Sequence, residues 1–282
     1  PRSTLFPYTT LFRSIVDISG SAVWGIQRLL RSDGLTSDAY LSLGFKKGKI
    51  VTEGQAFEIT GTAIDQSLYT HALYGRADLA WTFLPGQLAR VSVTPQAVLQ
   101  KGDDHVPNRV DLLGLEQDVK QVVAGAEYEL NVLGDRLSNI LFGKLYHQGV
   151  YYEFLNDLAG MKVRGELTRD ATYYGGGDSL RYRFFDGLLA KLSYEYATRL
   201  PRGVELFGDG VLVRPNPDLK PERSHNVNLG PRLELRQTRA GAFTVDVNGF
   251  LRETKDLIVF LASVQGAPHQ NILDVRSRGV EG

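Results

Sequence analysis

NPDLKPERSHNVNLG, residues 216–230, is the stretch that decides the fold class of this chain. Its prolines fix φ and keep the residue before each of them out of the helical region, so the segment is extended. From Asn226 onward polar and apolar residues alternate, as in a strand whose two faces meet different surroundings. One face carries Val227, Leu229, Leu233 and Leu235, and the other carries Asn226, Asn228, Arg232 and Glu234. The stretch therefore predicts a loop that enters a β-strand.

The same alternation continues on both sides of this stretch. It covers residues 71–84, 88–100, 188–198 and 243–253. These runs of roughly 10 to 13 residues are longer than the ~5 to 6 of soluble proteins and match the ~9 to 11 of a tilted membrane-crossing strand. Helical periodicity is hard to find, so the sequence predicts an all-β chain of about a dozen strands.

The connections between these strands come in two sizes. The short ones are residues 85–87, 133–136, 186–187 and 237–241, and the long ones are residues 101–120, 150–175, 200–222 and 254–269. Outer-membrane barrels have short periplasmic turns and long external loops. We therefore expect the short turns at the periplasmic rim and the long loops outside.

The alternation also predicts which face meets lipid. Turning Lys191 toward lipid at the midplane would cost ~2 to 4 kcal/mol, whereas turning Leu192 inward forfeits only its burial. We expect the apolar faces to look outward and the charged faces to line a lumen. Residues 137–147 are apolar on both faces, so their register is not predicted. Pro95 and Pro231 each remove a ladder donor within a predicted strand, and we expect bulges there.

Four segments in order resemble the TonB-dependent outer-membrane receptors. They are YATRLPRGVELFGDG at 196–210, the opening stretch at 216–230, VNGFLRETKDLIVF at 247–260 and NILDVRSRGVEG at 271–282. The residues that carry the family motif are Asn216, Pro217, Asp218, Leu219, Lys220, Pro221, Glu222 and Ser224. The resemblance implies an antiparallel transmembrane β-barrel in the bacterial outer membrane, of which this chain is a part, about 12 of roughly 22 strands. Asn228 departs from the family pattern, where we expect a Glu, so a lumenal ion pair at this position is in doubt.

The resemblance also implies a function. A receptor of this family captures a scarce solute such as a ferric siderophore, cobalamin or a glycan on its external loops. Its partners are outer-membrane lipid, the small-molecule or metal-chelate ligand, and the inner-membrane TonB complex acting through a plug region. It is no enzyme and needs no cofactor. A passive, porin-like barrel and a soluble, secreted carbohydrate-binding β-protein are the alternatives, and the soluble protein predicts an apolar interior and a polar exterior.

The two ends of the sequence carry expectations of their own. Residues 4–14 read like the translation of a sequencing adapter, so we divide the chain into an artefactual segment at 1–14 and a partial receptor barrel at 15–282. We expect a signal peptide, a plug and a TonB-contacting segment before Ile15, and further strands after Gly282.

The loop at 200–222 contains the candidate residues for ligand contact. They are Arg202, Phe207, Asp209 and Arg214, because arginines and aromatics suit anionic, aromatic chelates. The alternative is a loop that only caps the rim. For Trp81, Tyr194 and Tyr196, near strand ends, we favour an interfacial girdle over ligand stacking.

Composition excludes several other classes of protein. Among 282 residues, Lys plus Arg and Asp plus Glu both total 32, so no net charge attracts nucleic acid. With no cysteine there is neither a disulfide framework nor a thiolate metal site. No nucleophile elbow, zinc-binding His-Glu-x-x-His or phosphate loop occurs. Asp103, Asp104 and His105 could touch a cation, but we favour a solvated loop and predict no metal site.

Overall fold

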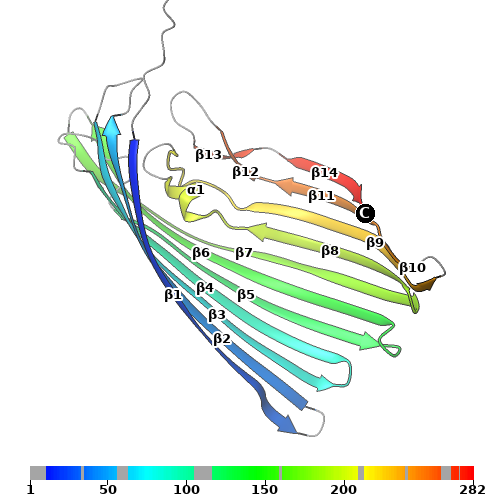
Figure 1. Ribbon diagram of the computed structural model, residues 1–282. Coiled ribbons are helices and arrows are strands. Elements are labelled where there is room, and N and C mark those ends of the chain that lie inside the picture. Colours follow the sequence, from blue (N-terminus) through cyan, green and yellow to red (C-terminus); the bar gives the residue numbers. More distant parts are fainter. Residues whose placement is uncertain are drawn as a thin grey trace, which may run out of the picture.

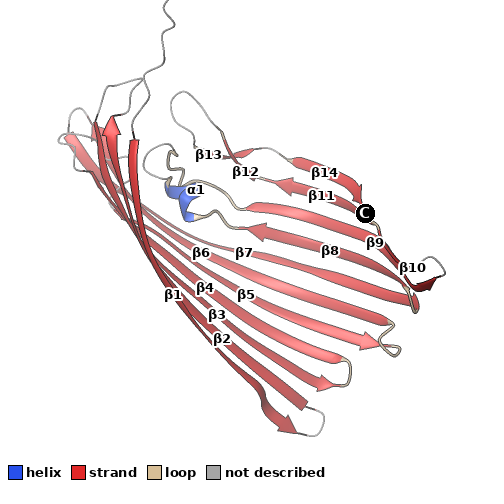
Figure 2. Ribbon diagram, in the orientation of Figure 1, coloured by secondary structure: helices blue, strands red, loops and turns tan. Residues whose placement is uncertain are grey.

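A long antiparallel sheet forms almost the whole of the structure, a computed structural model (Figures 1 and 2). It describes residues 11–32, 35–55, 63–104, 116–158, 161–208, 213–238, 241–261, 268–272 and 274–282. Within them, a 12-stranded sheet runs in the order β1-β2-β3-β4-β5-β6-β7-β8-β9-β11-β14, with β10 also paired to β9, and β12 and β13 form a two-stranded sheet. The elements are β1 (Leu11–Ser32), β2 (Leu35–Gln55), β3 (Ala63–Leu84), β4 (Gln87–Asp104), β5 (Glu116–Val132), β6 (Leu137–Leu158), β7 (Met161–Phe185), β8 (Leu188–Arg199), α1 (Gly203–Phe207), β9 (Glu222–Thr238), β10 (Gly241–Asp246), β11 (Asn248–Lys255), β12 (Leu257–Phe260), β13 (His269–Ile272) and β14 (Val275–Glu281). The prediction of a partial, antiparallel all-β barrel is confirmed.

Several strands are longer than the sequence pattern indicated. β8 has 12 residues, but β6 has 22 and β7 has 25. The prediction of a long loop at 150–175 is wrong, because β6 and β7 stay paired up to Leu158 and Met161. The inner side chains of this extension, such as Tyr152, pack in the cluster around α1, which favours continued pairing of the two strands.

Tight turns close one rim of the sheet as predicted. They occur at residues 85–86, 133–136 and 186–187, whereas residues 239–240 lie outside the described part of the chain. Gly86 has φ of 76°, and a Cβ there would lie 2.2 Å from the Asn131 carbonyl oxygen. Gly187 has φ of 119° in the predicted Asp-Gly turn. Both positions need glycine because their backbones adopt a conformation that L side chains rarely reach.

Neither strand proline produces the bulge that we expected. Around Pro95 the β3–β4 ladder breaks off after Tyr74↔Gln96 and resumes at Ala77↔Val93 in the same register. At Pro231, strand pairing divides into β10 and β11 at Val247, whose N–H donates to the Pro231 oxygen at 3.1 Å. A proline lacks only a donor, so the ladder loses bonds there without needing an extra residue.

The two faces of the sheet differ as predicted. We call the face that carries α1 the inner face. On the opposite, outer face, Leu192 is 45% exposed, Val245 53% and Leu145 58%. The structure also settles the register of residues 137–147, because Leu145 looks outward while Lys144 reaches Glu195 on the inner face at 3.1 Å. An apolar exterior contradicts the soluble carbohydrate-binding alternative. Among the described residues, no helix has the length and apolar character of a membrane span.

Aromatic side chains lie near both ends of this outer apolar face. Toward the tight turns, Trp81 and Phe83 have ring centroids 5.7 Å apart. Toward the long loops, the ring centroid of Tyr196 lies 5.5 Å from that of Tyr174 and 4.9 Å from that of His225. This arrangement matches the two interfacial girdles of an outer-membrane barrel.

Candidate functional site

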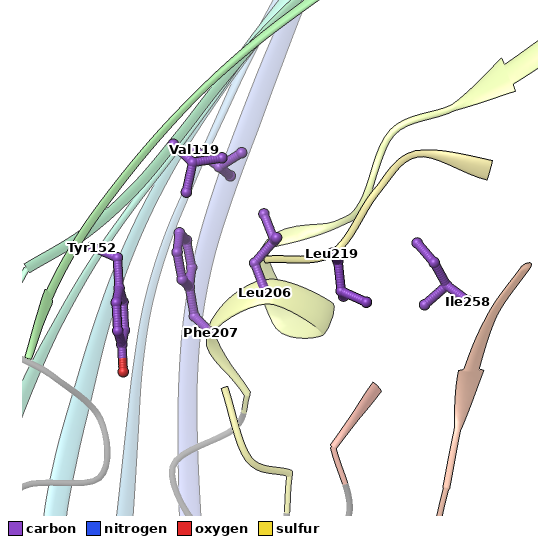
Figure 3. Packing of buried hydrophobic residues seen from close by; sticks show 7 residues of the cluster. Val119, Tyr152, Leu206, Phe207, Leu219 and Ile258 are labelled. Carbon is purple, nitrogen blue, oxygen red and sulfur yellow. The ribbon is translucent and has the colours of Figure 1, made fainter. Parts of the chain in front are cut away.

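The segment between β8 and β9 folds into the curve of the sheet instead of projecting away from it (Figure 1). Its short helix α1 contributes Leu206 and Phe207, which are each 1% exposed. The Phe207 ring stacks on Tyr152 of β6 at 5.9 Å and an interplanar angle of 7°. Figure 3 shows the cluster that they join, which comprises Val119, Val150, Tyr152, Leu206, Phe207, Leu219 and Ile258. We call it the inner cluster.

Two glutamines hold the beginning of this loop against the wall. Gln121 of β5 and Gln148 of β6 both donate from Nε2 to the Pro201 carbonyl oxygen, each at 3.0 Å. Pro201 is fully buried. Its carbonyl oxygen therefore uses both acceptor positions on groups from two neighbouring strands, which fixes where the loop starts.

Arg199, the last residue of β8, joins three segments. Its Nη1 lies 3.0 Å from both carboxylate oxygens of Glu205 in α1, and its Nη2 donates to Glu222 Oε1 at 2.5 Å. The same Glu222 oxygen accepts the Ile258 N–H of β12 at 2.8 Å. Glu205 also accepts the N–H of Arg202 at 2.8 Å, so it satisfies a donor that precedes the helix. We call Arg199, Glu205 and Glu222 the arginine junction.

The charges of this junction stabilise one another. Hydrogen bonding to Glu222 raises the pKa of Arg199 above its ordinary value, and Glu205 adds to the effect. Burial alone would raise the pKa of Glu222, but the hydrogen bonds from Arg199 and from the Ile258 N–H outweigh it and lower that pKa. Both groups are therefore charged at neutral pH.

Hydrogen bonds join the family motif, residues 216–224, to the β12–β13 hairpin. Asn216 donates from Nδ2 to the His269 oxygen at 2.8 Å, and its N–H reaches the Leu206 oxygen at 2.7 Å. The Lys220 N–H donates to Asn271 Oδ1 at 2.8 Å, while Asn271 Nδ2 donates back to the Lys220 oxygen at 2.9 Å. Leu219 is buried in the inner cluster. The motif thus links α1, β9 and the hairpin.

The remaining motif residues have less involved roles. Pro221 is buried, Pro217 is half-buried and Asp218 is exposed. Ser224, within β9, accepts a hydrogen bond from Asn226 Nδ2 at 3.0 Å. These residues shape the backbone that carries Leu219 and Glu222.

The four candidate ligand contacts fall into different places. Arg202 and Arg214 are exposed on the loop. Phe207 is in the inner cluster, where it anchors the loop and is covered by Tyr152. Asp209 lies outside the described residues. Among the described candidates, Phe207 is buried and the two arginines stay exposed, on a loop that Leu206, Phe207 and Leu219 hold in position.

Sequence reasoning missed the residues that fix the loop. Arg199, Glu205, Gln121 and Gln148 were not singled out, although Arg199 and Glu205 fall within the resembling segment at 196–210. The available signal was Arg199 just before the loop, with Glu205 near its start and Glu222 at its end. The glutamines gave none, because alternation predicts only that they face inward.

Below the loop the inner wall is lined by ion pairs. Arg90 lies 2.7 Å from Glu127, and Lys191 lies 3.6 Å from Asp246. Asn228, which departs from the family pattern, donates to Ser193 Oγ at 3.3 Å, so a hydrogen bond stands where we considered an ion pair. The charged faces line the interior, as predicted.

No group of three or more His, Asp or Glu side chains able to hold a metal ion occurs within the described parts of the chain. Asp103 and Asp104 end β4, and His105 lies outside the described residues.

Comparisons with known proteins agree with this architecture. A family model described as "TonB dependent receptor-like, beta-barrel" matches residues 72–282. The copper transporter OprC superposes with a TM-score of 0.73 at 14% identity, over 94% of this chain and 44% of that one. The ferric yersiniabactin uptake receptor FyuA from Yersinia pestis gives 0.62 at 13% identity, over 94% and 39%. BauA, the ferric preacinetobactin receptor from Acinetobacter baumannii, gives 0.55 at 13%, over 95% and 42%.

The chain thus spans less than half the length of these three structures. At this identity the likeness concerns the fold alone. No curated protein sequence matches the chain.

Proposed function

The chain belongs to the TonB-dependent receptor β-barrel family of the bacterial outer membrane, and we propose from this premise that it forms wall and loops of a receptor for a scarce solute. The complete receptor would include a plug region, contact the inner-membrane TonB complex through it, and draw its energy from that complex. Bound solute would pass along the ion-paired inner wall once the plug moves. No catalytic step is assigned to any residue.

One observation carries the proposal. The loop between β8 and β9 buries Leu206, Phe207 and Leu219 in the inner cluster and leaves Arg202 and Arg214 exposed. A loop tied down in this way can present two cations without first paying the entropy of ordering itself. Arginine is well suited to anionic groups, because its guanidinium offers paired donors to carboxylate or phenolate oxygens.

These features favour an anionic metal chelate, such as a ferric siderophore, as the ligand. The names of the three similar structures, which specify copper, ferric yersiniabactin and ferric preacinetobactin, support a metal-related solute. Cobalamin and glycans offer less negative charge to the two arginines. They are the competing ligands in the experiment below.

The uptake experiment uses the complete receptor, expressed in a bacterium that lacks its own siderophore receptors, with and without a functional TonB. Radioactive iron is supplied on hydroxamate, catecholate and carboxylate siderophores. We expect uptake of at least one chelate only when TonB is present. Equal uptake without TonB would establish the passive, porin-like barrel instead. Uptake of labelled cobalamin or maltodextrin with no iron chelate would refute the ligand class.

An arginine variant tests the site itself. Replacing Arg202 and Arg214 by alanine should raise the half-saturating chelate concentration at least about tenfold, since hydrogen bonds to charged groups contribute ~1.5 to 3 kcal/mol. Arg136→Ala, at an exposed arginine in the tight turn of the opposite rim, is the matched control and should leave uptake unchanged. If the double variant took up the chelate as the original receptor does, the loop would not be part of the ligand site, but the transport proposal would stand.

A further inference from the structure

The apolar outer face carries a carboxylate midway between its two aromatic girdles. On β7, Tyr174 belongs to the girdle toward the long loops, with its ring centroid 5.5 Å from that of Tyr196. Tyr182 lies toward the tight turns, with its ring centroid 4.9 Å from that of Phe184. Asp178 stands midway between the two tyrosines of β7, about 13 Å along the strand from each at ~3.3 Å per residue. Asp178 therefore lies near the middle of the apolar band.

Strand pairing shows that Asp178 faces lipid. Its partners across the two ladders are Leu141 of β6 and Tyr194 of β8. Residues directly opposite each other in an antiparallel pair share a face. Leu141 is 56% exposed and Tyr194 is 43% exposed on the outer face, and the Asp178 side chain is exposed between them. The carboxylate thus points away from the ion-paired inner wall.

The chain itself does little to stabilise a charge on Asp178. Asn139 Nδ2 donates to Asp178 Oδ1 at 2.5 Å and also lies 3.3 Å from the Ser179 oxygen. Asn139 is neutral, and within the described part of the chain no cation forms an ion pair with Asp178. An ionised carboxylate has about four acceptor positions, and hydrocarbon offers them no donor. Acidic side chains in the membrane are costly and mark functional positions. The stability of the strand therefore does not explain an aspartate here.

Two glycines leave the backbone uncovered next to Asp178. Gly143 and Gly176 form the next outward-facing pair of the β6–β7 ladder toward the long loops. A Cβ at Gly176 would come within 2.9 Å of the Phe142 oxygen, so neighbouring backbone explains that glycine. Gly143 has nothing within 4 Å of an added Cβ and no positive φ, so packing within the chain does not require it. Small residues let a second protein approach closely within a membrane.

We propose that Asp178, Gly143 and Gly176 form a docking site for another membrane-embedded protein, which places a lysine or arginine opposite Asp178. In hydrocarbon a single charge is unfavourable, so an ion pair between the two proteins removes a cost that each has when separate. The glycines allow the partner's backbone to come close enough for its cation to donate to Asp178 Oδ2, which Asn139 does not contact. The proposal requires only the membrane location and is independent of the transported solute.

Other occupants complement the site less well. An acyl chain has no donor for the carboxylate, and lipid head groups lie at the level of the girdles, away from Asp178. A second copy that used the same patch in a two-fold dimer would bring two Asp178 carboxylates together. A basic side chain on a different protein fits both the charge and the depth of the site.

A transmembrane peptide serves as the probe of the partner's chemistry. The complete receptor is placed in phosphatidylcholine vesicles, and energy transfer reports its association with a Leu-Ala peptide of about 24 residues that has one central lysine. The same peptide with a central leucine is the reference. We expect the receptor to bind the lysine peptide at least about tenfold more tightly, and Asp178→Asn to lose this preference. Asp78→Asn is the matched control and should keep it, because Asp78 pairs with Arg76 on the inner face.

A pair of glycine variants tests the shape of the site. Gly143→Leu covers the bare backbone and should weaken binding of the lysine peptide at least about tenfold. Gly249→Leu is the control, because Gly249 pairs with Leu229 on the outer face of β11 but lies three strands from Asp178. It should bind as the unaltered receptor does, and an equal loss in this control would overturn the proposal. Heat-modifiable gel mobility establishes that each variant is folded.

The stability of the receptor alone separates docking from a structural role. In vesicles, Asp178→Leu should unfold at the same or a higher urea concentration than the unaltered receptor, because it removes a polar group from a lipid-facing surface. A lower midpoint would make Asp178 a structural residue and overturn the proposal. Equal binding of the lysine and leucine peptides would also overturn it. So would association between two labelled receptors that disappears in Asp178→Asn, because the occupant would then be a second copy.

Discussion

The inner cluster and the outer apolar face contain the same kinds of side chain in opposite surroundings. Phe207 of α1 is 1% exposed against Tyr152, whereas Leu145 of β6 is 58% exposed on the other side of the same sheet. Protein atoms cover the first surface, and lipid covers the second. Loss of a side chain should therefore leave a cavity on the inner side only, because lipid chains can rearrange to fill a gap.

Polar and charged residues are distributed differently on the two faces of the sheet. Inside, Arg199, Glu205 and Glu222 meet one another at the mouth, and ion pairs such as Arg90 with Glu127 line the wall below. Outside, charged side chains of both signs, such as Lys101 with Glu116, lie toward the long loops. The burial of a side chain in this protein thus depends on two things: which face of the sheet it occupies, and how close it lies to the long-loop end of its strand.

The largest expected effect is that of Phe207→Ala. Removing a buried phenyl ring should cost ~3 to 5 kcal/mol of loop docking, so amides of α1 should exchange with solvent at least about a hundredfold faster. Hydrogen exchange with mass spectrometry measures this. Val204→Ala is the control, since Val204 lies in the same helix and is 46% exposed. Equal exchange in the two variants would mean that the inner cluster does not hold the loop.

Leu192→Arg tests the outer face with a charge. On lipid-facing strands an arginine costs ~2 to 4 kcal/mol near the midplane. We expect that loss in the free energy of unfolding, measured by urea titration of the receptor in lipid vesicles. Lys191→Leu, one residue earlier and facing inward, breaks only a partly exposed contact to Asp246 and should cost at most ~1 kcal/mol. The reverse ranking would mean that the two faces are misassigned.

A pair of leucine truncations compares the two surfaces directly. Leu206→Ala in the inner cluster should cost ~2 to 5 kcal/mol because a cavity remains. Leu145→Ala should cost only the ~1 to 2 kcal/mol of transferring fewer methylene groups into lipid. Hydrogen exchange of α1 reports the first loss and urea unfolding in vesicles the second. A Leu145→Ala cost equal to that of Leu206→Ala would show that lipid does not fill the gap.

The smallest expected effect is a pH dependence of the arginine junction. The pKa of Glu222 lies below its ordinary value of 4.5 when the loop is docked. Docking is therefore favoured above about pH 4.5 and loses this contribution as the pH falls through the lowered pKa. Exchange protection of α1 should stay constant from about pH 7 to 5, after correction for intrinsic rates, and fall below about 4.5. Glu222→Gln should reduce that acid-dependent fall. If the variant showed the same fall, a group other than Glu222 would be its cause.

Much of the fold was predictable from particular residues. Alternation around Leu192 and Val245 indicated strands and placed these side chains on the outer face, and the Asp-Gly pair at 186–187 indicated a tight turn. The long loop predicted at 150–175 was wrong because pairing between β6 and β7, supported by the packing of Tyr152, extends the strands. Phe207 shows the limit for the site. An aromatic residue in a loop gives the same sequence signal whether it faces a ligand or a core.

The sequence alone determined that strands alternate between two environments, since that period is a property of neighbouring residues and the pleat converts it into two faces. Tertiary structure decided the rest. Arg199 meets Glu205 and Glu222, and Gln121 and Gln148 meet at the Pro201 oxygen, only because strand register and an inward-folded loop bring separate segments together. Such contacts depend on the pairing of residues distant in the chain, and no local pattern encodes them.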